Sequence, residues 1–168
     1  MGSFRNSIIG PRQMSDSYLR CIPVDPRFQP TRDAALSAAD LLRSFLPQAQ
    51  TIDGEFFDSV RFVDAGCNWA GVHCPSCGAD IDPWWADAVS EAWKTGFTTL
   101  QIRSRCCETT VSLYDFDYGW PVGFASYILE ALNPSSKLCR HLNYQRLSPN
   151  SAVPRERYQH IIERDRQG

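Results

Sequence analysis

The feature that most constrains this chain is a pair of cysteines in the stretch Cys74-Pro-Ser-Cys77-Gly78. Two cysteines that flank a tight turn can point both sulfurs at one metal ion, and Gly78 permits the positive φ that such a turn often needs. A structural zinc ion takes four ligands in a tetrahedron. The chain has no second pair with this spacing, so the other half of the site must come from elsewhere.

The adjacent cysteines Cys106 and Cys107 are the best candidates for the second half. Apolar residues alternate with polar ones in the flanking segments 98–105 and 109–116. This alternation predicts two antiparallel strands joined by a hairpin with both cysteines at its tip. Neighbouring side chains point apart in a regular strand, but in a turn they need not. The predicted zinc ligands are therefore Cys74, Cys77, Cys106 and Cys107.

Two points about the cysteines stay open in the sequence. If only one of Cys106 and Cys107 binds the metal, another side chain supplies the fourth ligand, and the candidates are His73, Cys67 and His141. Cysteines outside the site are expected to be packing or surface thiols, because cysteine is among the most buried residue types. This group comprises Cys21, Cys67 and Cys139.

Catalytic interpretations have weaker support. Cysteine pairs with this spacing also occur as redox dithiols, but those usually open a helix directly after a strand. Here Asp82 and Pro83 begin the next helix several residues later. Asp115 and Asp117 form an acidic pair, for which solvent exposure or helix capping is the simpler explanation. A cysteine–histidine nucleophilic pair is a remote alternative, and we predict no catalytic residue.

Composition favours a protein of the cytoplasm. Of the 168 residues 43% are apolar, enough for a core. No apolar run approaches the ~20 residues that a membrane span requires, and no secretory leader is visible. The seven cysteines are an odd number, which argues against a secreted disulfide framework. We therefore expect a cytoplasmic protein with no membrane partner.

Charge divides the chain into an acidic body and a basic end. Residues 1–134 contain 10 Lys/Arg and 16 Asp/Glu, whereas residues 135–168 contain 7 and 3. The acidic body repels phosphate backbones, so any contact with nucleic acid falls to the basic end. We predict a disordered extension over 1–16, one domain over 17–134, and a basic tail over 135–168 with a short helix near 154–165.

Apolar spacing and capping residues predict three helices in the domain. Thr31 can cap a helix over 32–46. The second helix is expected between Asp82 as N-cap and Gly96 as C-terminal cap. The third covers 121–132, where large apolar residues recur every four positions before an Asn-Pro stop.

Strands are expected over 18–24 and 59–64, in addition to the cysteine hairpin. The resulting fold class is α+β. A small antiparallel sheet carries helices on one side, and a zinc-ribbon-like knuckle is inserted in the domain.

Aromatic residues gather around the predicted site in the sequence. Trp85, Val89 and Trp93 recur every four residues, so the second helix is expected to bury a Trp-rich face. An exposed tryptophan would suit a protein-binding surface, because Trp and Tyr dominate interface hot spots. The candidates are Trp69, Trp84 and Trp120.

The order of the motifs resembles a group of small uncharacterised bacterial zinc-knuckle proteins of unknown function. The shared pattern is C-P-x-C-G, then W-W, then C-C, then D-x-x-Y-x-W-P-x-G-F, and it covers residues 17–134. The resemblance implies zinc bound by the four cysteines named above and makes Cys67 and His73 incidental. It implies no particular activity.

Three functional hypotheses follow from these observations. The leading one is a non-catalytic, zinc-stabilised interaction protein of the bacterial cytoplasm, such as an antitoxin or immunity protein that covers a basic toxin. The alternative is a nucleic-acid-binding zinc ribbon that uses the basic tail 135–168. The third is an enzyme with a pocket that holds Asp115, Asp117 or a cysteine outside the metal site.

Overall fold

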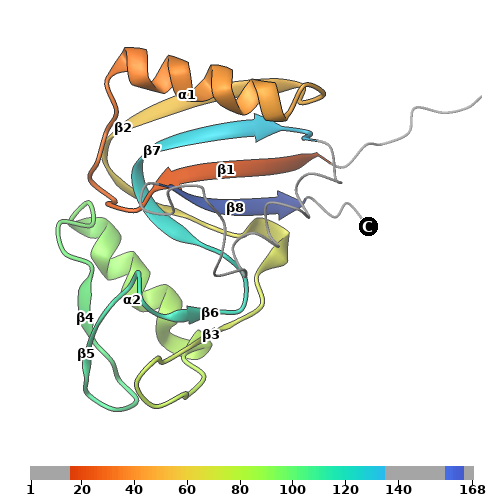
Figure 1. Ribbon diagram of the computed structural model, residues 1–168. Coiled ribbons are helices and arrows are strands. Elements are labelled where there is room, and N and C mark those ends of the chain that lie inside the picture. The colour runs from red at the N-terminus through yellow and green to blue at the C-terminus, as the bar shows by residue number, and fades with distance from the viewer. Residues whose placement is uncertain (1–15, 135–157, 165–168) are drawn as a thin grey trace, which may run out of the picture.

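The computed structural model describes residues 16–134 and 158–164. Its centre is a four-stranded antiparallel sheet in the order β2-β7-β1-β8, with helix α1 (Arg32–Phe45) on one face (Figure 1). The strands are β1 (Ser17–Pro23), β2 (Thr51–Val63), β7 (Gly123–Leu132) and β8 (Tyr158–Arg164). The fold is α+β, as predicted.

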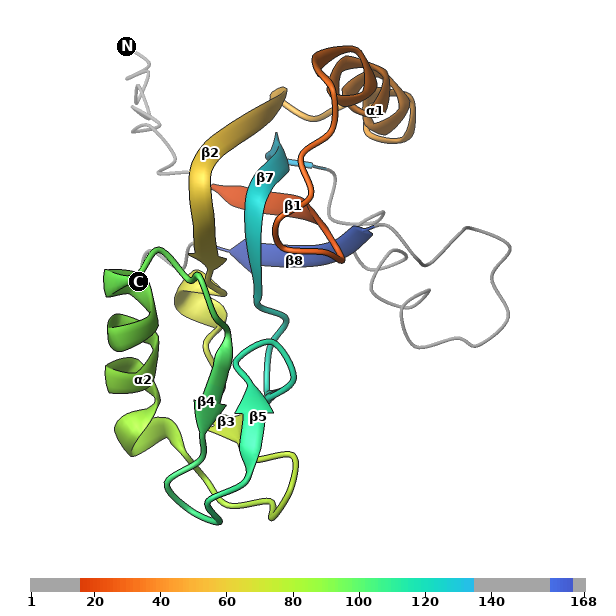
Figure 2. The ribbon, with the colours of Figure 1, turned by 90° about the vertical axis from the view of Figure 1, so that its left-hand side faces the viewer.

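Residues 64–122 form an insert at one end of the sheet. Strands β2 and β7 pair with each other, and the last pair before the insert is Val63, where β2 ends, opposite Gly123, where β7 begins. Figure 2 shows both strands running down from the sheet to the insert. The insert contains η1 (Gly66–Asn68), β3 (Val72–His73), α2 (Asp82–Lys94), β4 (Gln101–Arg103), β5 (Thr110–Ser112) and β6 (Asp117–Tyr118). This insert is the predicted inserted knuckle.

Helix α1 confirms the prediction from apolar spacing and capping. The Thr31 hydroxyl accepts a hydrogen bond from the Ala34 N–H at 3.2 Å, which satisfies one free donor of the first turn. Ala35 and Ala39 are buried against the sheet. Their small side chains let the helix approach residues of three strands, namely Leu19, Cys21, Ile52, Tyr127, Leu129 and Ala131.

The predicted helix over 121–132 is wrong, because Gly123–Leu132 form strand β7 between β2 and β1. The apolar repeat of four residues fits a helical stripe and also every second residue on one face of a strand. The first half of β7 is buried on both faces, so its sequence lacks the alternation that marks a half-buried strand.

The short helix predicted near 154–165 is also wrong where the structure describes it. Residues 158–164 form strand β8, which pairs with all of β1 from Ser17 opposite Arg164 to Pro23 opposite Tyr158. The sheet therefore extends beyond residue 134, the predicted end of the domain. The rest of the predicted tail and residues 1–15 lie outside the described residues.

Helix α2 departs from its prediction in two details. Asp82 is the first helical residue rather than the N-cap, which is Ile81. Trp85 is buried, but Trp93 is 55% exposed. The chain turns back after the helix and places Phe97 in the core, where Trp93 was expected, so that Trp93 only packs edge-on against the Phe97 ring.

The remaining strands follow the predicted order with different lengths. β2 begins eight residues before the predicted start and carries a bulge between Phe56 and Arg61. The cysteine hairpin is shorter than predicted, with Ile102 opposite Val111 at its centre. Among the helices that the structure describes, none is both long and apolar enough to cross a membrane.

Phe124 joins the sheet to the insert and gives the first testable prediction. Its ring is fully buried and contacts Phe62 of β2 and Phe97 of the insert, at 5.2 and 5.3 Å between centroids. Phe124→Ala is expected to lower the free energy of unfolding by about 3–5 kcal/mol, since a large cavity forms. Urea denaturation measures this change. Phe45→Ala, at a side chain that is 59% exposed, should cost less than about 1 kcal/mol; equal losses would contradict the assignment of Phe124 to the core.

Candidate metal centre

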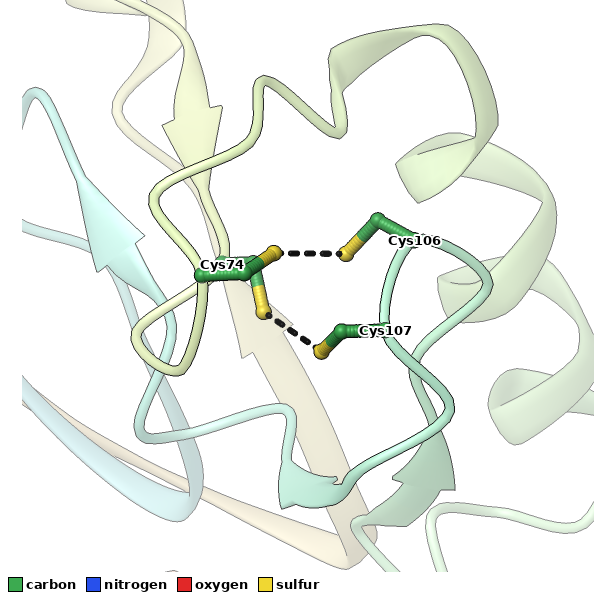
Figure 3. Close-up of side chains that lie close together, drawn as sticks. Cys74, Cys106 and Cys107 are labelled. Carbon is green, nitrogen blue, oxygen red and sulfur yellow. Dashed lines mark hydrogen bonds between the residues drawn. The ribbon is translucent and has the colours of Figure 1, made fainter.

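The four predicted cysteines come together in the insert. Their Sγ atoms all lie within 4.8 Å of one another, in a group that could hold one metal ion. Figure 3 shows the two loops facing each other across this group. The Sγ atoms of Cys77 and Cys106 are 3.4 Å apart, and those of Cys74 and Cys107 are 3.7 Å apart. Both cysteines at the hairpin tip therefore face the first pair.

The first loop is a tight knuckle that follows β3. The Cys74 N–H donates to the Ala79 carbonyl at 2.9 Å, and the Gly78 N–H donates to the Cys74 carbonyl at 2.8 Å. Gly78 has φ of +72°, the positive value expected from the sequence. These bonds fix the turn so that Cys74 and Cys77 both point away from it toward the second loop.

The second loop has the same backbone hydrogen bonds as the first. The Ser104 N–H donates to the Thr109 carbonyl at 2.9 Å, and the Glu108 N–H donates to the Ser104 carbonyl at 2.8 Å. Glu108 has φ of +60° at the position equivalent to Gly78. The loop is therefore a second knuckle, in which Ser104 occupies the position of Cys74 and Cys107 that of Cys77.

Ser104 is the residue of the site that sequence reasoning missed. Its side chain is fully buried, and its Oγ lies 2.9 Å from Cys106 Sγ and 3.6 Å from Cys74 Sγ. The signal was present as the spacing of Ser104 and Cys107, which equals that of the first pair. Because the first knuckle position holds serine, the fourth sulfur comes from Cys106, and this explains the unusual adjacent pair.

The local environment separates the pKa values of the clustered thiols. Burial raises the pKa of Cys74, but hydrogen bonds from the Ser104 hydroxyl and from turn amides outweigh burial and lower this pKa to about 6. The Ala79 N–H favours the Cys77 thiolate, yet the neighbouring Cys106 thiol and desolvation raise the pKa of Cys77 to about 12. Hydrogen bonds from Thr109 lower the pKa of Cys107 as well. The thiols therefore differ in how readily they ionise, and four thiolates this close together would repel one another without a cation between them.

An aromatic core supports the first knuckle. Cys74 is 1% exposed and belongs to the same buried cluster as Trp85 and Phe97. The Trp85 Nε1–H donates to the Tyr118 hydroxyl at 3.2 Å, and that hydroxyl donates to the Leu113 carbonyl at 2.6 Å. Burial raises the pKa of Tyr118, which therefore stays neutral and keeps this donor. The knuckle is thus held from beneath by a packed and hydrogen-bonded layer.

The alternative ligands do not join the sulfur group. Cys67 is exposed in η1, and His73 is exposed at the end of β3, where its backbone pairs with Asp117. Neither belongs to the group of four sulfurs. Cys21 is buried beneath α1, as expected of a packing thiol. Cys139 and His141 lie outside the described residues.

The other sequence candidates occupy separate places. Asp115 and Asp117 are exposed, and neither lies in the metal-ligand group. The three tryptophans predicted for an interface are all partly buried. These are Trp69, Trp84 and Trp120. Trp69 donates through Nε1 to the Asp82 carboxylate at 3.0 Å.

Comparison of the chain with protein-family models, curated proteins and solved structures finds no match of any of the three kinds. The resemblance suggested by the motifs therefore stays a prediction.

The equivalence of the two knuckles predicts that the fourth cysteine can be moved from position 106 to position 104 without loss of metal binding. Cys106→Ser alone should remove most metal binding, because it leaves three sulfurs. Ser104→Cys added to Cys106→Ser should restore it, since residue 104 occupies the regular first position of the second knuckle and already lies near Cys74. Metal per chain by elemental analysis, with the cobalt(II) spectrum as a measure of thiolate coordination, compares the two. A double variant that binds no more metal than Cys106→Ser would contradict the equivalence.

Proposed function

We propose that Cys74, Cys77, Cys106 and Cys107 bind one structural zinc ion, and that the chain is a non-catalytic interaction protein of the bacterial cytoplasm. The observation that carries the metal assignment is the convergence of four sulfurs from two facing knuckles. Separate segments of the chain supply the two halves, so the four sulfurs are brought together by the fold of the insert.

The donor set favours zinc in a structural role. Thiolate sulfur is a preferred ligand of zinc, and four sulfurs fill its tetrahedron without leaving a position for water or substrate. The divalent charge would also favour the thiolate form of Cys77, whose pKa the neighbouring Cys106 thiol and desolvation raise to about 12. The Ser104 hydroxyl would remain as a hydrogen-bond donor to the bound thiolates, especially that of Cys106.

Besides its aromatic core, the insert has only short strand pairs to hold its loops together. Its two sheets contain two strands each, and the strands are two or three residues long. Isolated strand pairs of this size are marginal in water. A metal that joins the two knuckles would therefore contribute directly to the free energy of folding.

An interaction role is supported by the charge and by exposed apolar groups. Residues 1–134 carry six more acidic than basic side chains. Helix α1 exposes Leu36, Leu41 and Phe45, and α2 exposes Trp93. An acidic surface favours a basic partner and speeds encounter with it, while exposed aromatic residues serve as anchors. An antitoxin or immunity protein that covers a basic toxin is the specific form that we propose.

The zinc proposal predicts different effects for two cysteine variants. Wild-type protein purified without chelator should contain one zinc per chain by elemental analysis. Cys107→Ser should contain much less zinc and unfold at a lower temperature. Three thiolates bind zinc more weakly than four, and without bound zinc the two knuckles are no longer linked. Cys67→Ser changes an exposed cysteine outside the group and should match the wild type in both respects. Absence of metal from the wild type would leave four free thiols and would rule the proposal out.

The interaction role predicts a basic partner. The tagged wild-type protein should retain, from a lysate of its own source, a protein of opposite charge that salt elutes, because contacts between exposed charges are screened. Repeating the capture with Cys107→Ser tests whether the intact insert is needed. A clean negative over a range of salt concentrations would count against the interaction role while leaving the zinc site unaffected.

A further inference from the structure

A groove of about 490 Å³ lies on the sheet face opposite α1. Ile52, Leu129 and Leu19 point toward α1, and side chains alternate along a strand, so their neighbours point to the other face. We call this hollow the acidic groove. The lining residues that matter here are Arg20, Asp53, Glu55, Phe57, Ile128 and Glu130.

Strand register concentrates carboxylates on one side of the groove. Asp53 of β2 lies directly opposite Glu130 of β7, which in turn lies opposite Arg20 of β1. Like charges directly opposite each other on antiparallel strands are destabilising. The Arg20 Nε donates to Glu130 at 2.7 Å and so offsets the charge of that carboxylate. The fold thus accepts an unfavourable pair at this position.

Two carboxylates on β2 remain without a cationic partner. Among the residues that the structure describes, no ion pair or hydrogen bond reaches the side chains of Asp53 and Glu55. The Arg61 guanidinium, which also lines the groove, instead stacks over the Phe57 ring at 4.3 Å from its centroid. The lining of the groove thus holds four carboxylates and two guanidinium groups, a net charge of −2.

The groove also has apolar lining residues, and two of them, Val63 and Ile128, belong to an apolar cluster of the sheet. Ile22, Val63 and Ala125 form a buried cluster on this face, and the partly exposed Ile128 packs against it. Glu55 lies directly opposite Ile128 in the β2–β7 register. An apolar surface thus borders unpaired carboxylates, a combination that fits a lysine side chain, whose methylene stem packs on apolar groups while its ammonium group reaches the charge.

The position of β2 also suits an extended ligand. β2 is an edge strand of the sheet, so its outer side is not paired within the sheet order. Extended segments bind such edges with side chains spaced to enter neighbouring pockets. We propose that the acidic groove binds a lysine-rich, extended segment of a protein partner, a proposal that rests on the interaction role proposed above and places it on the sheet.

The test is peptide binding by a pair of charge-matched variants. Asp53→Asn/Glu55→Gln removes two charges from the groove, and Asp87→Asn/Glu91→Gln removes two exposed charges from α2. The probe is a fluorescein-labelled octalysine peptide, followed by fluorescence anisotropy at low ionic strength, with an acetyl-lysine peptide as the uncharged control. We expect the groove variant to bind octalysine roughly tenfold more weakly and the α2 variant less than about twofold more weakly.

Folding and metal content are measured on the same variants. Asp53→Asn relieves the repulsion from Glu130, so the groove variant should unfold at the same or a higher temperature than the wild type. Zinc per chain should be unchanged, because Asp53 and Glu55 lie outside the sulfur group. Weaker peptide binding by a folded, zinc-loaded groove variant would therefore come from the lost charges and support the proposal.

Three results would overturn the proposal. Equal weakening in both variants would mean that octalysine binds through the overall negative charge of the protein. This result would exclude the acidic groove as the binding site and leave the interaction role in place. Failure of the wild type to bind octalysine at low ionic strength would also exclude the acidic groove as a binding site for lysine-rich segments. If the groove variant binds normally but self-associates, the carboxylates serve to protect the edge of β2 from pairing with other chains.

Discussion

The antiparallel pairing of β2 with β7 is the interaction on which the other parts of this structure depend. It joins two segments that are separated by the 59 residues between Val63 and Gly123, and it closes the base of the insert. The same β7 strand provides the partner of β1 and part of the core beneath α1. Phe124 adds an aromatic contact between the sheet and the insert. If this pairing fails, the insert loses its anchor and the sheet loses its central strand.

Within the insert, two equivalent knuckles meet and create a local electrostatic problem. Four thiols within 4.8 Å cannot all ionise without a cation, and their pKa values diverge accordingly. Because position 104 holds serine, the regular positions of the two knuckles provide only three sulfurs. Cys106, in the second loop, supplies the fourth. The buried Ser104 hydroxyl keeps its place as a hydrogen-bonding neighbour of the sulfurs. A zinc ion would resolve the charge and join the loops with one set of bonds.

The sheet and the insert would have different roles in the proposed interaction protein. The insert supplies the four-cysteine group and an aromatic core in which Trp69 and Trp84 are half-buried. The sheet supplies a face on which Asp53 and Glu55 form no ion pair with any described residue. Charges placed opposite one another lower stability, so their presence is better explained by an external partner or by protection of the edge strand than by folding.

The sequence by itself determined the features that depend on neighbouring residues. The spacing of Cys74 and Cys77, the hairpin tip at Cys106 and Cys107, and the capping of α1 by Thr31 were all predicted from local patterns. The α+β class followed from the same patterns. These predictions succeeded because turns, caps and alternating strands are set by interactions within a few residues.

Only the tertiary structure decided the identity of β7 and β8 and the role of Ser104. A strand buried on both faces has no alternating pattern, so β7 resembled a helix until its partners β2 and β1 were known. β8 owes its conformation to seven paired positions on β1, at the opposite end of the chain. Ser104 became recognisable only when its backbone bonds matched those of Cys74. The physical reason is common to all three: their conformation or role is fixed by partners distant in sequence, and local propensity carries no information about them.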